Sequence, residues 1–339
     1  MFENYDKENM FESIWNFPNN LKDAITLGDG IDLKNDYSHI NNIVIAGMGG
    51  SAIGGDIVSV LENSNINIPY TVCRDYSIPG WVNSSSLVIC SSYSGNTEET
   101  ISCYKSAIKR KISPVIVSSG GYILDNAKKY NYDFVELPKG IQPRAAFGYS
   151  ASLLLLAFVE IGIIDKEYNK QLFKTISSIK SKSNEYAKIS NSNISLNLSK
   201  VIFNKFPIIY CTVNTEVVGF RFRCQLAENS KILSSHFVLP EQNHNEIEGF
   251  LNNDISNYVI LWIKDKNDNN RTIKRINVTS KLLKNIKNQF IYDNDSDSLL
   301  ERLFNLIYLF DWVSFYCAIL HKTNPTPVKT ILKLKSLMS

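Results

Sequence analysis

The chain has 339 residues, 44% of them hydrophobic and 20% charged, as in globular proteins long enough to form two domains. Its 36 basic and 33 acidic side chains nearly balance, so neither a nucleic acid nor an anionic membrane is expected as a partner. The six cysteines are scattered without a C-x-x-C pair, which favours reduced thiols in a cytoplasmic protein over a disulfide or zinc framework.

The first half of the chain alternates predicted strands and helices. Residues 1–38 predict one or two short helices that cover an edge of the first domain, and their sequence is unlike a signal peptide. Short apolar runs then predict strands at 43–46, 70–73, 87–90, 114–117 and 133–136. Strands separated by helices indicate a parallel sheet covered on both faces, and such sheets bind ligands at the carboxyl ends of their strands.

The pattern restarts in the second half. Two long helices are predicted over residues 145–187, and the apolar stretch near 153–158 is too short to span a bilayer. Further strands are predicted at 207–211, 237–239, 258–263 and 290–292, with helices at 217–226, 271–285 and 298–320 and a short C-terminal helix. We therefore predict an α/β fold with two doubly wound, flavodoxin-like parallel sheets related by internal duplication, in domains of residues 1–155 and 156–339.

Two loops of the first half favour an anion site. Residues 91–100 lead from a predicted strand into a helix and carry the hydroxyls of Ser92, Ser94 and Thr97, which can hold a phosphate together with the helix N-terminus. The simpler alternative is that one hydroxyl caps the helix. Residues 47–55 are glycine-rich and contain G-x-G-x-x-A. This motif alone is weak evidence for a dinucleotide, and its glycines can instead serve close packing.

Three isolated residues are candidates for chemistry. Arg144 follows the fifth strand and can stabilise negative charge, although a surface arginine is the commoner case. Glu228 lies near a helix end, where a carboxylate opposes the helix dipole and suits a general base, although from spacing alone a solvated glutamate is the commoner case. His244 has few apolar neighbours, so it is either an acid–base group or a plain loop histidine. The carboxylates around it lack the spacing of a zinc site.

The motifs GMGGSAIGGD, SSYSGNTEET, PRAA, AENSK and EQNHNEI, in this order, closely resemble the archaeal-type bifunctional phosphoglucose/phosphomannose isomerases of the sugar isomerase (SIS) superfamily. The resemblance extends from about residue 43 to the C-terminus. It implies an aldose–ketose isomerase that interconverts glucose 6-phosphate and mannose 6-phosphate with fructose 6-phosphate through an enediol, without a metal or another cofactor. It also implies a homodimer whose subunits share the active sites.

The resemblance assigns roles to residues of both predicted SIS domains. The sugar would be lined by Gly49, Gly50 and Ser51, and its phosphate held by Ser92, Ser94 and Thr97. Arg144 would stabilise the enediolate, Glu228 would move the proton between C1 and C2, and His244 would open the sugar ring in the partner subunit's site.

The C-terminal tail matches the family pattern T-P-V-x-x-I-x-x-L-K. The resemblance therefore implies that Lys335 enters the site, with Lys333 and Lys329 as alternatives. Thr326 or Thr330 would support turnover of mannose 6-phosphate. Asn324 stands where the family usually has an acid, a departure that we expect to be structural.

A sugar-phosphate sensor without catalysis is the main alternative from another class. SIS modules occur in transcription regulators, which carry a DNA-binding helix-turn-helix segment. A sensor would have no need of Glu228 and His244 together, so the isomerase is the favoured prediction.

Overall fold

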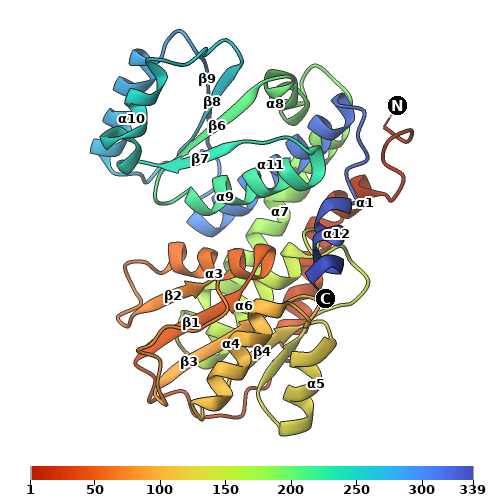
Figure 1. Ribbon diagram of the computed structural model, residues 1–339, viewed down its shortest axis with the longest axis vertical. Helices are drawn as coiled ribbons and strands as arrows, with labels where there is room; N and C mark the ends of the chain where they lie inside the picture. The colour runs from red at the N-terminus through yellow and green to blue at the C-terminus, as the bar shows by residue number, and fades with distance from the viewer. Residues whose placement is uncertain (1, 339) are drawn as a thin grey trace. The chain divides into compact units, whose positions relative to one another are not determined.

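A computed structural model describes residues 2–338 of the chain (Figure 1). The chain forms two compact units, one of Phe17–Ser177 and one of residues 2–16 and 178–338. These units differ from the predicted division after residue 155. Residues 156–177 belong to the first unit, and the N-terminal segment belongs to the second. The difference arises because the helix Glu167–Ala187 (α7) continues across the boundary between the units.

The first unit contains a five-stranded parallel sheet in the order β2-β1-β3-β4-β5. Its strands are β1 Asn42–Gly47, β2 Tyr70–Cys73, β3 Ser86–Ser91, β4 Val115–Ser118 and β5 Phe134–Glu136. Its helices are α2 Phe17–Gly28, α3 Gly49–Leu61, α4 Glu98–Lys109, α5 Gly121–Tyr130 and α6 Phe147–Ile161, with the first part of α7. The strand order confirms the predicted flavodoxin-like sheet.

Burial explains why the apolar runs form the central strands. Every residue of β1 and β3 is buried, as expected for parallel strands covered on both faces. Alternate residues such as Val44, Val88 and Ile116 pack against α4 and α5, and α3 and α6 lie together on the other face (Figure 1). The sheet is therefore rigid up to its carboxyl edge, where the two candidate loops begin.

The second unit repeats this plan with one strand fewer. Its parallel sheet has the order β7-β6-β8-β9, which matches β2-β1-β3-β4 of the first sheet and confirms the internal duplication. The strands are β6 Phe206–Cys211, β7 Ser235–Val238, β8 Tyr258–Ile263 and β9 Lys287–Ile291. The helices are α1 Met10–Trp15, α8 Ile194–Ile202, α9 Glu216–Gln225, α10 Asn270–Leu282, α11 Leu299–Leu320 and α12 Lys329–Met338. Short helical turns are η1 Leu226–Ser230, η2 Glu241–His244 and η3 Glu246–Phe250.

The aromatic residues of the N-terminal segment divide between the units. Phe17 begins α2 and lies against Gly148 of α6 in the first unit, as predicted, whereas Phe11 packs on the second unit. The Phe11 ring lies edge-on to Trp312 and Phe315 of α11, with centroids 5.0 and 5.8 Å apart. Phe2 stacks on Phe11 at 5.1 Å. The prediction was wrong for Phe11 because an apolar pattern indicates burial without identifying the surface that covers the side chain.

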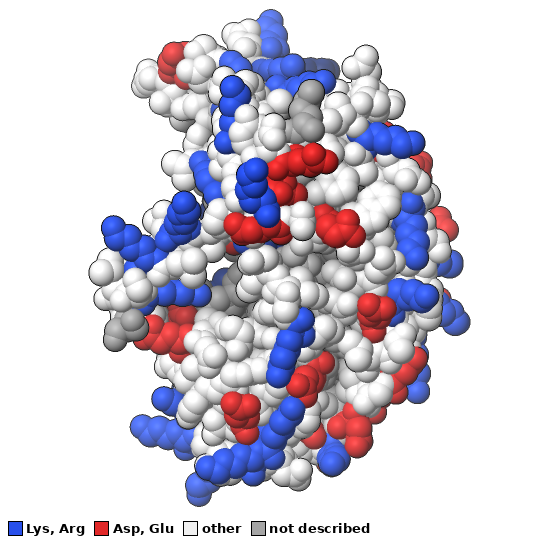
Figure 2. Space-filling view, turned by 90° about the vertical axis from the view of Figure 1, so that its right-hand side faces the viewer, with Lys and Arg blue, Asp and Glu red and all other residues white. Residues whose placement is uncertain are grey.

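The helix α11 is long and apolar enough to cross a membrane by length and composition alone. However, 89% of the most apolar 18-residue stretch of α11 is buried, and the helix packs against α8 and α9. It is thus the central core helix of the second unit. On the surface, basic and acidic side chains are interspersed over the face shown in Figure 2, in keeping with the nearly balanced composition.

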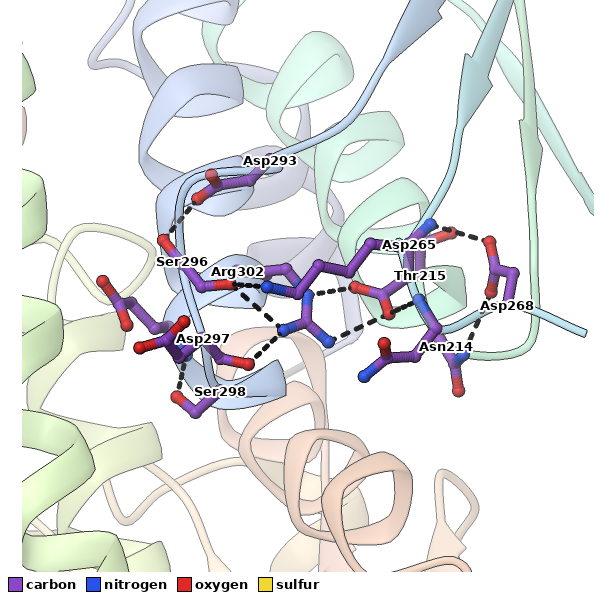
Figure 3. A network of polar contacts seen from close by, with 12 residues as sticks. Asn214, Thr215, Asp265, Asp268, Asp293, Ser296, Asp297, Ser298 and Arg302 are labelled. Atoms are coloured by element: carbon purple, nitrogen blue, oxygen red, sulfur yellow. Dashed lines mark hydrogen bonds and ion pairs between the residues drawn. The ribbon is translucent and has the colours of Figure 1, made fainter.

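A buried ion pair closes the carboxyl edge of the second sheet (Figure 3). The Arg302 guanidinium on α11 donates through Nε and Nη2 to both oxygens of Asp265, which follows β8. Its Nη1 donates to the carbonyl of Asp297 at 2.6 Å, in the loop after β9. The side chains of Arg302 and Asp265 are each only 1% exposed. One cation therefore joins two loops to the core helix.

Candidate functional site

The serine loop has the geometry of an anion cradle. The hydroxyls of Ser92 and Thr97 are hydrogen bonded to each other at 2.8 Å, and Ser94 is exposed at the tip of the loop. Thr97 is the N-cap residue of α4 but makes no side-chain cap bond, so helix capping does not explain its hydroxyl. The first-turn N–H groups of α4 and these hydroxyls can together receive a phosphate.

A glycine is required inside this loop. Gly95 has φ +67°, and a Cβ there would lie 1.7 Å from the carbonyl oxygen of Gly120. No other residue fits without moving the backbone, because the contact is with main chain. The residue therefore fixes the sharp turn that brings Ser92 and Thr97 together.

The glycine-rich loop serves two purposes. Gly49, with φ +51° and open space around it, begins α3, and the Ser51 hydroxyl accepts a hydrogen bond from the Tyr93 N–H at 3.2 Å. This bond connects the glycine loop directly to the serine loop. Gly55, by contrast, packs α3 on the sheet, since a Cβ there would lie 3.1 Å from Ile45. Gly47 is also restricted by packing, since a Cβ there would lie 2.8 Å from the Ser91 carbonyl oxygen. Packing thus explains both ends of the glycine run but not Gly49.

Arg144 lies in the turn before α6 and is 6% exposed. A Cβ on Gly50 would come within 3.8 Å of the Pro143 carbonyl, so this turn faces the glycine loop. Tyr93 also supports the preceding segment, because its hydroxyl donates to Pro138 O at 2.9 Å and accepts from the Ile141 N–H at 3.1 Å. The structure therefore brings the predicted residues of the first unit to one edge of its sheet. Sequence reasoning missed Tyr93, although it stands inside the serine run.

Glu228 lies on η1, a π-helical turn that continues α9. Its neighbours are bonded to α11: Asn229 Nδ2 donates to the Ser314 hydroxyl at 2.9 Å, and the Ser230 hydroxyl donates to the Ser314 carbonyl at 2.7 Å. Both neighbours are buried, whereas Glu228 is partly exposed. Single π turns within helices frequently occur at functional sites.

Lys231 joins this turn to the C-terminal tail. It has φ +59°, and its ammonium donates to the carbonyls of Glu228, Asn229 (3.3 Å) and Pro325 (3.0 Å). An ammonium has three donors, so this side chain can hold three backbone carbonyls at once. The sequence showed Lys231 only as part of AENSK, and its role as a link became visible in the structure.

A pocket of about 560 Å³ lies beside Glu228 within the second unit. Its lining residues are Ala227, Glu228, Lys231, Ile232, Leu233, Thr323, Asn324, Pro327, Val328, Lys329, Thr330 and Ile331. The structure therefore brings Thr330 and Lys329 toward Glu228, whereas Thr326 is 2% exposed and does not line the pocket.

The preferred lysine, Lys335, is exposed on α12 and, like Lys333, does not line this pocket. A helix advances about 100° per residue, so Lys335 lies roughly 240° around the axis from Lys329. The two lysines thus occupy different faces of α12. Which of them acts in the site stays a prediction.

His244 is exposed at the end of η2 and does not line the Glu228 pocket. Asn243 Nδ2 on η2 donates to Thr279 Oγ1 of α10 at 2.9 Å. The Tyr210 hydroxyl of β6 donates to Glu246 Oε1 at 3.1 Å, and burial raises the pKa of Glu246 to about 7. Within residues 2–338, no three His, Cys, Asp or Glu side chains are grouped so that they could hold a metal ion.

Comparison with known proteins supports an isomerase of sugar phosphates. The family profile described as "Bacterial phospho-glucose isomerase C-terminal SIS domain" matches residues 191–338. The bifunctional phosphoglucose/phosphomannose isomerase of Caldicellulosiruptor bescii is 38% identical over 334 residues, with 96% of this chain and 98% of that protein covered. The enzyme of the same name from Aquifex aeolicus is 36% identical over 309 residues, with 90% and 92% covered.

A solved structure shows the same fold. The C-terminal domain of glucosamine-fructose-6-phosphate aminotransferase from Francisella tularensis superimposes with a TM-score of 0.76 at 14% identity, with 94% of this chain and 98% of that chain covered. At this identity the likeness concerns the fold alone, and it agrees with two SIS domains.

Proposed function

This chain belongs to the family of bifunctional phosphoglucose/phosphomannose isomerases, and on that basis we propose that it interconverts glucose 6-phosphate and mannose 6-phosphate with fructose 6-phosphate. The observation that carries the proposal is 38% identity to such an enzyme over nearly the full length of both chains. The charged substrates also fit a cytoplasmic location.

The proposed reaction moves one proton from C2 to C1 and one between the C2 and C1 oxygens, through an enediol. The Glu228 carboxylate removes the C2 proton of the open-chain aldose, the C1 carbonyl oxygen takes up a proton, and the C2 hydroxyl loses one. Glu228 then returns its proton to C1 to give the ketose. Arg144 stabilises the negative charge of the enediolate, and Ser92, Ser94 and Thr97 hold the phosphate. The partial exposure of Glu228 beside a pocket supports its role as a base.

The remaining roles complete the proposed site. Gly49, Gly50 and Ser51 line the sugar, and His244 opens its ring by acid–base catalysis. Lys335 supplies a further positive charge. Glucose and mannose phosphates differ only at C2, so one base beside a planar enediolate serves both if rotation about C2–C3 exposes either face.

The decisive experiment is a coupled assay of fructose 6-phosphate formation, with EDTA present. We expect conversion of both glucose 6-phosphate and mannose 6-phosphate. The proposal fails if well-folded protein converts neither substrate. Loss of both activities on adding EDTA would show that the proposed metal-free reaction is wrong.

We also propose that the enzyme is a homodimer and that His244 acts in the partner's site. In support, α12 has no buried residue and exposes Leu332, Leu334 and Leu337 by 56–76%, as a helix that covers another surface would.

Mixing two inactive variants tests this shared site. In a heterodimer of Glu228→Gln and His244→Ala chains, one of the two sites keeps both residues if His244 acts across the interface. Random reassortment should restore about a quarter of wild-type activity. The measurement is the coupled assay after the two variants are unfolded and refolded together. No regained activity, despite mixed dimers seen by native mass spectrometry, would place His244 in its own subunit's site.

A further inference from the structure

The exposed apex that carries His244 lies between two polar attachments. Before it, Asn243 Nδ2 donates to Thr279 Oγ1 at 2.9 Å, and Thr279 is buried in α10. After it, Glu246 accepts a hydrogen bond from the Tyr210 hydroxyl at 3.1 Å. Only His244 and Asn245 stand between these attachments, and both are exposed. The position of the imidazole therefore depends on the bonds on either side.

The attachment at Tyr210 is held by the core of the second sheet. Tyr210 is wholly buried in β6, and its ring lies 4.8 Å from that of Trp262 on the neighbouring strand. The core thus fixes the hydroxyl, and the hydroxyl fixes the carboxylate. Asn245 adds a local bridge, because its side chain accepts from the Glu246 N–H at 2.6 Å and donates to Glu241 at 2.8 Å.

Attaching the loop through the Glu246 carboxyl group costs free energy, because the group is partly buried, so the attachment calls for a functional reason. Glu246 is half-buried, and its Oε2 is buried with no hydrogen-bond partner among the described residues. Burying a carboxyl group opposes its ionisation, which accounts for the raised pKa of Glu246. An apolar side chain would hold an exposed loop at lower cost. The hydrogen bond from Tyr210 to Glu246 is directional, so it defines the orientation of the backbone two residues from His244, which apolar packing would not do.

We propose that Tyr210 and Glu246 are positioning residues that orient His244 for opening the sugar ring. This inference rests on the proposed function. Acid–base catalysis requires the imidazole within hydrogen-bond reach of the ring oxygen or hydroxyl, so a small shift of the apex slows ring opening. Glu228, the base for proton transfer at C2, is positioned independently of this apex, because its turn η1 is anchored to α11 through Ser314.

The test measures ring opening without isomerisation. The starting protein is the Glu228→Gln variant, which lacks the base for the C1–C2 step but retains His244. NMR exchange spectroscopy then follows the enzyme-catalysed exchange of the α and β anomers of glucose 6-phosphate. Adding Tyr210→Phe or Glu246→Leu should slow this exchange roughly ten- to a hundredfold. Adding Glu246→Gln, which keeps an acceptor oxygen for Tyr210, should preserve most of it.

A matched control is Tyr258→Phe. Tyr258 pairs with Phe206 in the sheet, whereas Tyr210 pairs with Trp262, so Tyr258 lies four residues nearer the amino ends of the strands. This variant should leave anomer exchange unchanged. Thermal unfolding checks that each protein is folded, and the two positions provide independent tests if one variant does not fold.

The outcomes separate this inference from the proposed function. If wild-type protein isomerises neither sugar phosphate, the proposed function fails first. If wild type isomerises both and Glu228→Gln exchanges anomers, but Tyr210→Phe and Glu246→Leu exchange them equally fast, the positioning role is wrong. Equal slowing by Glu246→Gln and Glu246→Leu would also overturn it, since the acceptor oxygen would then be irrelevant.

Discussion

Glu228→Gln is expected to lower kcat by about 10²–10⁴-fold with glucose 6-phosphate and mannose 6-phosphate alike, which is the contribution of a positioned general base. Glutamine has the size and hydrogen-bonding reach of glutamate but does not take up the C2 proton. KM should change little, because the proposed phosphate-binding hydroxyls belong to the loop before α4 and not to η1. The coupled assay, run with each substrate in turn, gives both constants.

A surface carboxylate provides the control for this substitution. Glu160 is exposed near the end of α6, and Glu160→Gln should leave both activities unchanged. Near-normal turnover by Glu228→Gln would show that the base is misassigned. Loss of only one of the two activities would show that separate bases serve the two sugars, contrary to a shared enediolate.

The strands were predictable because their side chains are buried on both faces. The run Leu87-Val88-Ile89-Cys90 is apolar at every position, and β3 extends it by one residue at each end. The parallel pairing followed from the alternation of strands with helices, because parallel strands are joined by helical crossovers. The serine loop was predictable for the same reason, since a polar run that follows a buried strand lies at the carboxyl edge of the sheet.

The local geometry around Glu228 could not be predicted from neighbouring residues. The π turn is held by bonds from Asn229 and Ser230 to Ser314, which lies 85 and 84 positions later in the sequence. Similarly, the link from Lys231 to Pro325 spans 94 positions. Sequence spacing describes periodicity within an element, whereas these bonds depend on how distant elements pack.

The C-terminal tail was also only partly predictable from the sequence. Lysines recur on α12, and helical periodicity places Lys329 and Lys335 on different faces. Periodicity does not say which face meets the substrate. The pocket beside Glu228 favours the face of Lys329 within one unit, while the motif favours Lys335.

Removing Asp265 is expected to destabilise the second unit more than any surface substitution. Asp265→Ala leaves the Arg302 guanidinium buried without its carboxylate partner, and breaking a buried ion pair in this way typically costs about 3–5 kcal/mol. The arginine also anchors the loop after β9 through the Asp297 carbonyl, so its displacement would loosen that loop as well. Urea unfolding followed by far-UV circular dichroism gives the change in unfolding free energy.

Two comparisons identify the origin of this loss. The double variant Asp265→Leu with Arg302→Met replaces both charges by apolar groups and should recover much of the stability, because no unpaired charge stays buried. Glu167→Ala breaks the exposed pair with Lys170 on α7 and should shift the unfolding midpoint negligibly, since solvent screens that pair. If Asp265→Ala and Glu167→Ala shifted the midpoint equally, water would have to reach Arg302. The loops after β8 and β9 would then be open in solution, and the bonds from Arg302 would not be what holds these loops against α11.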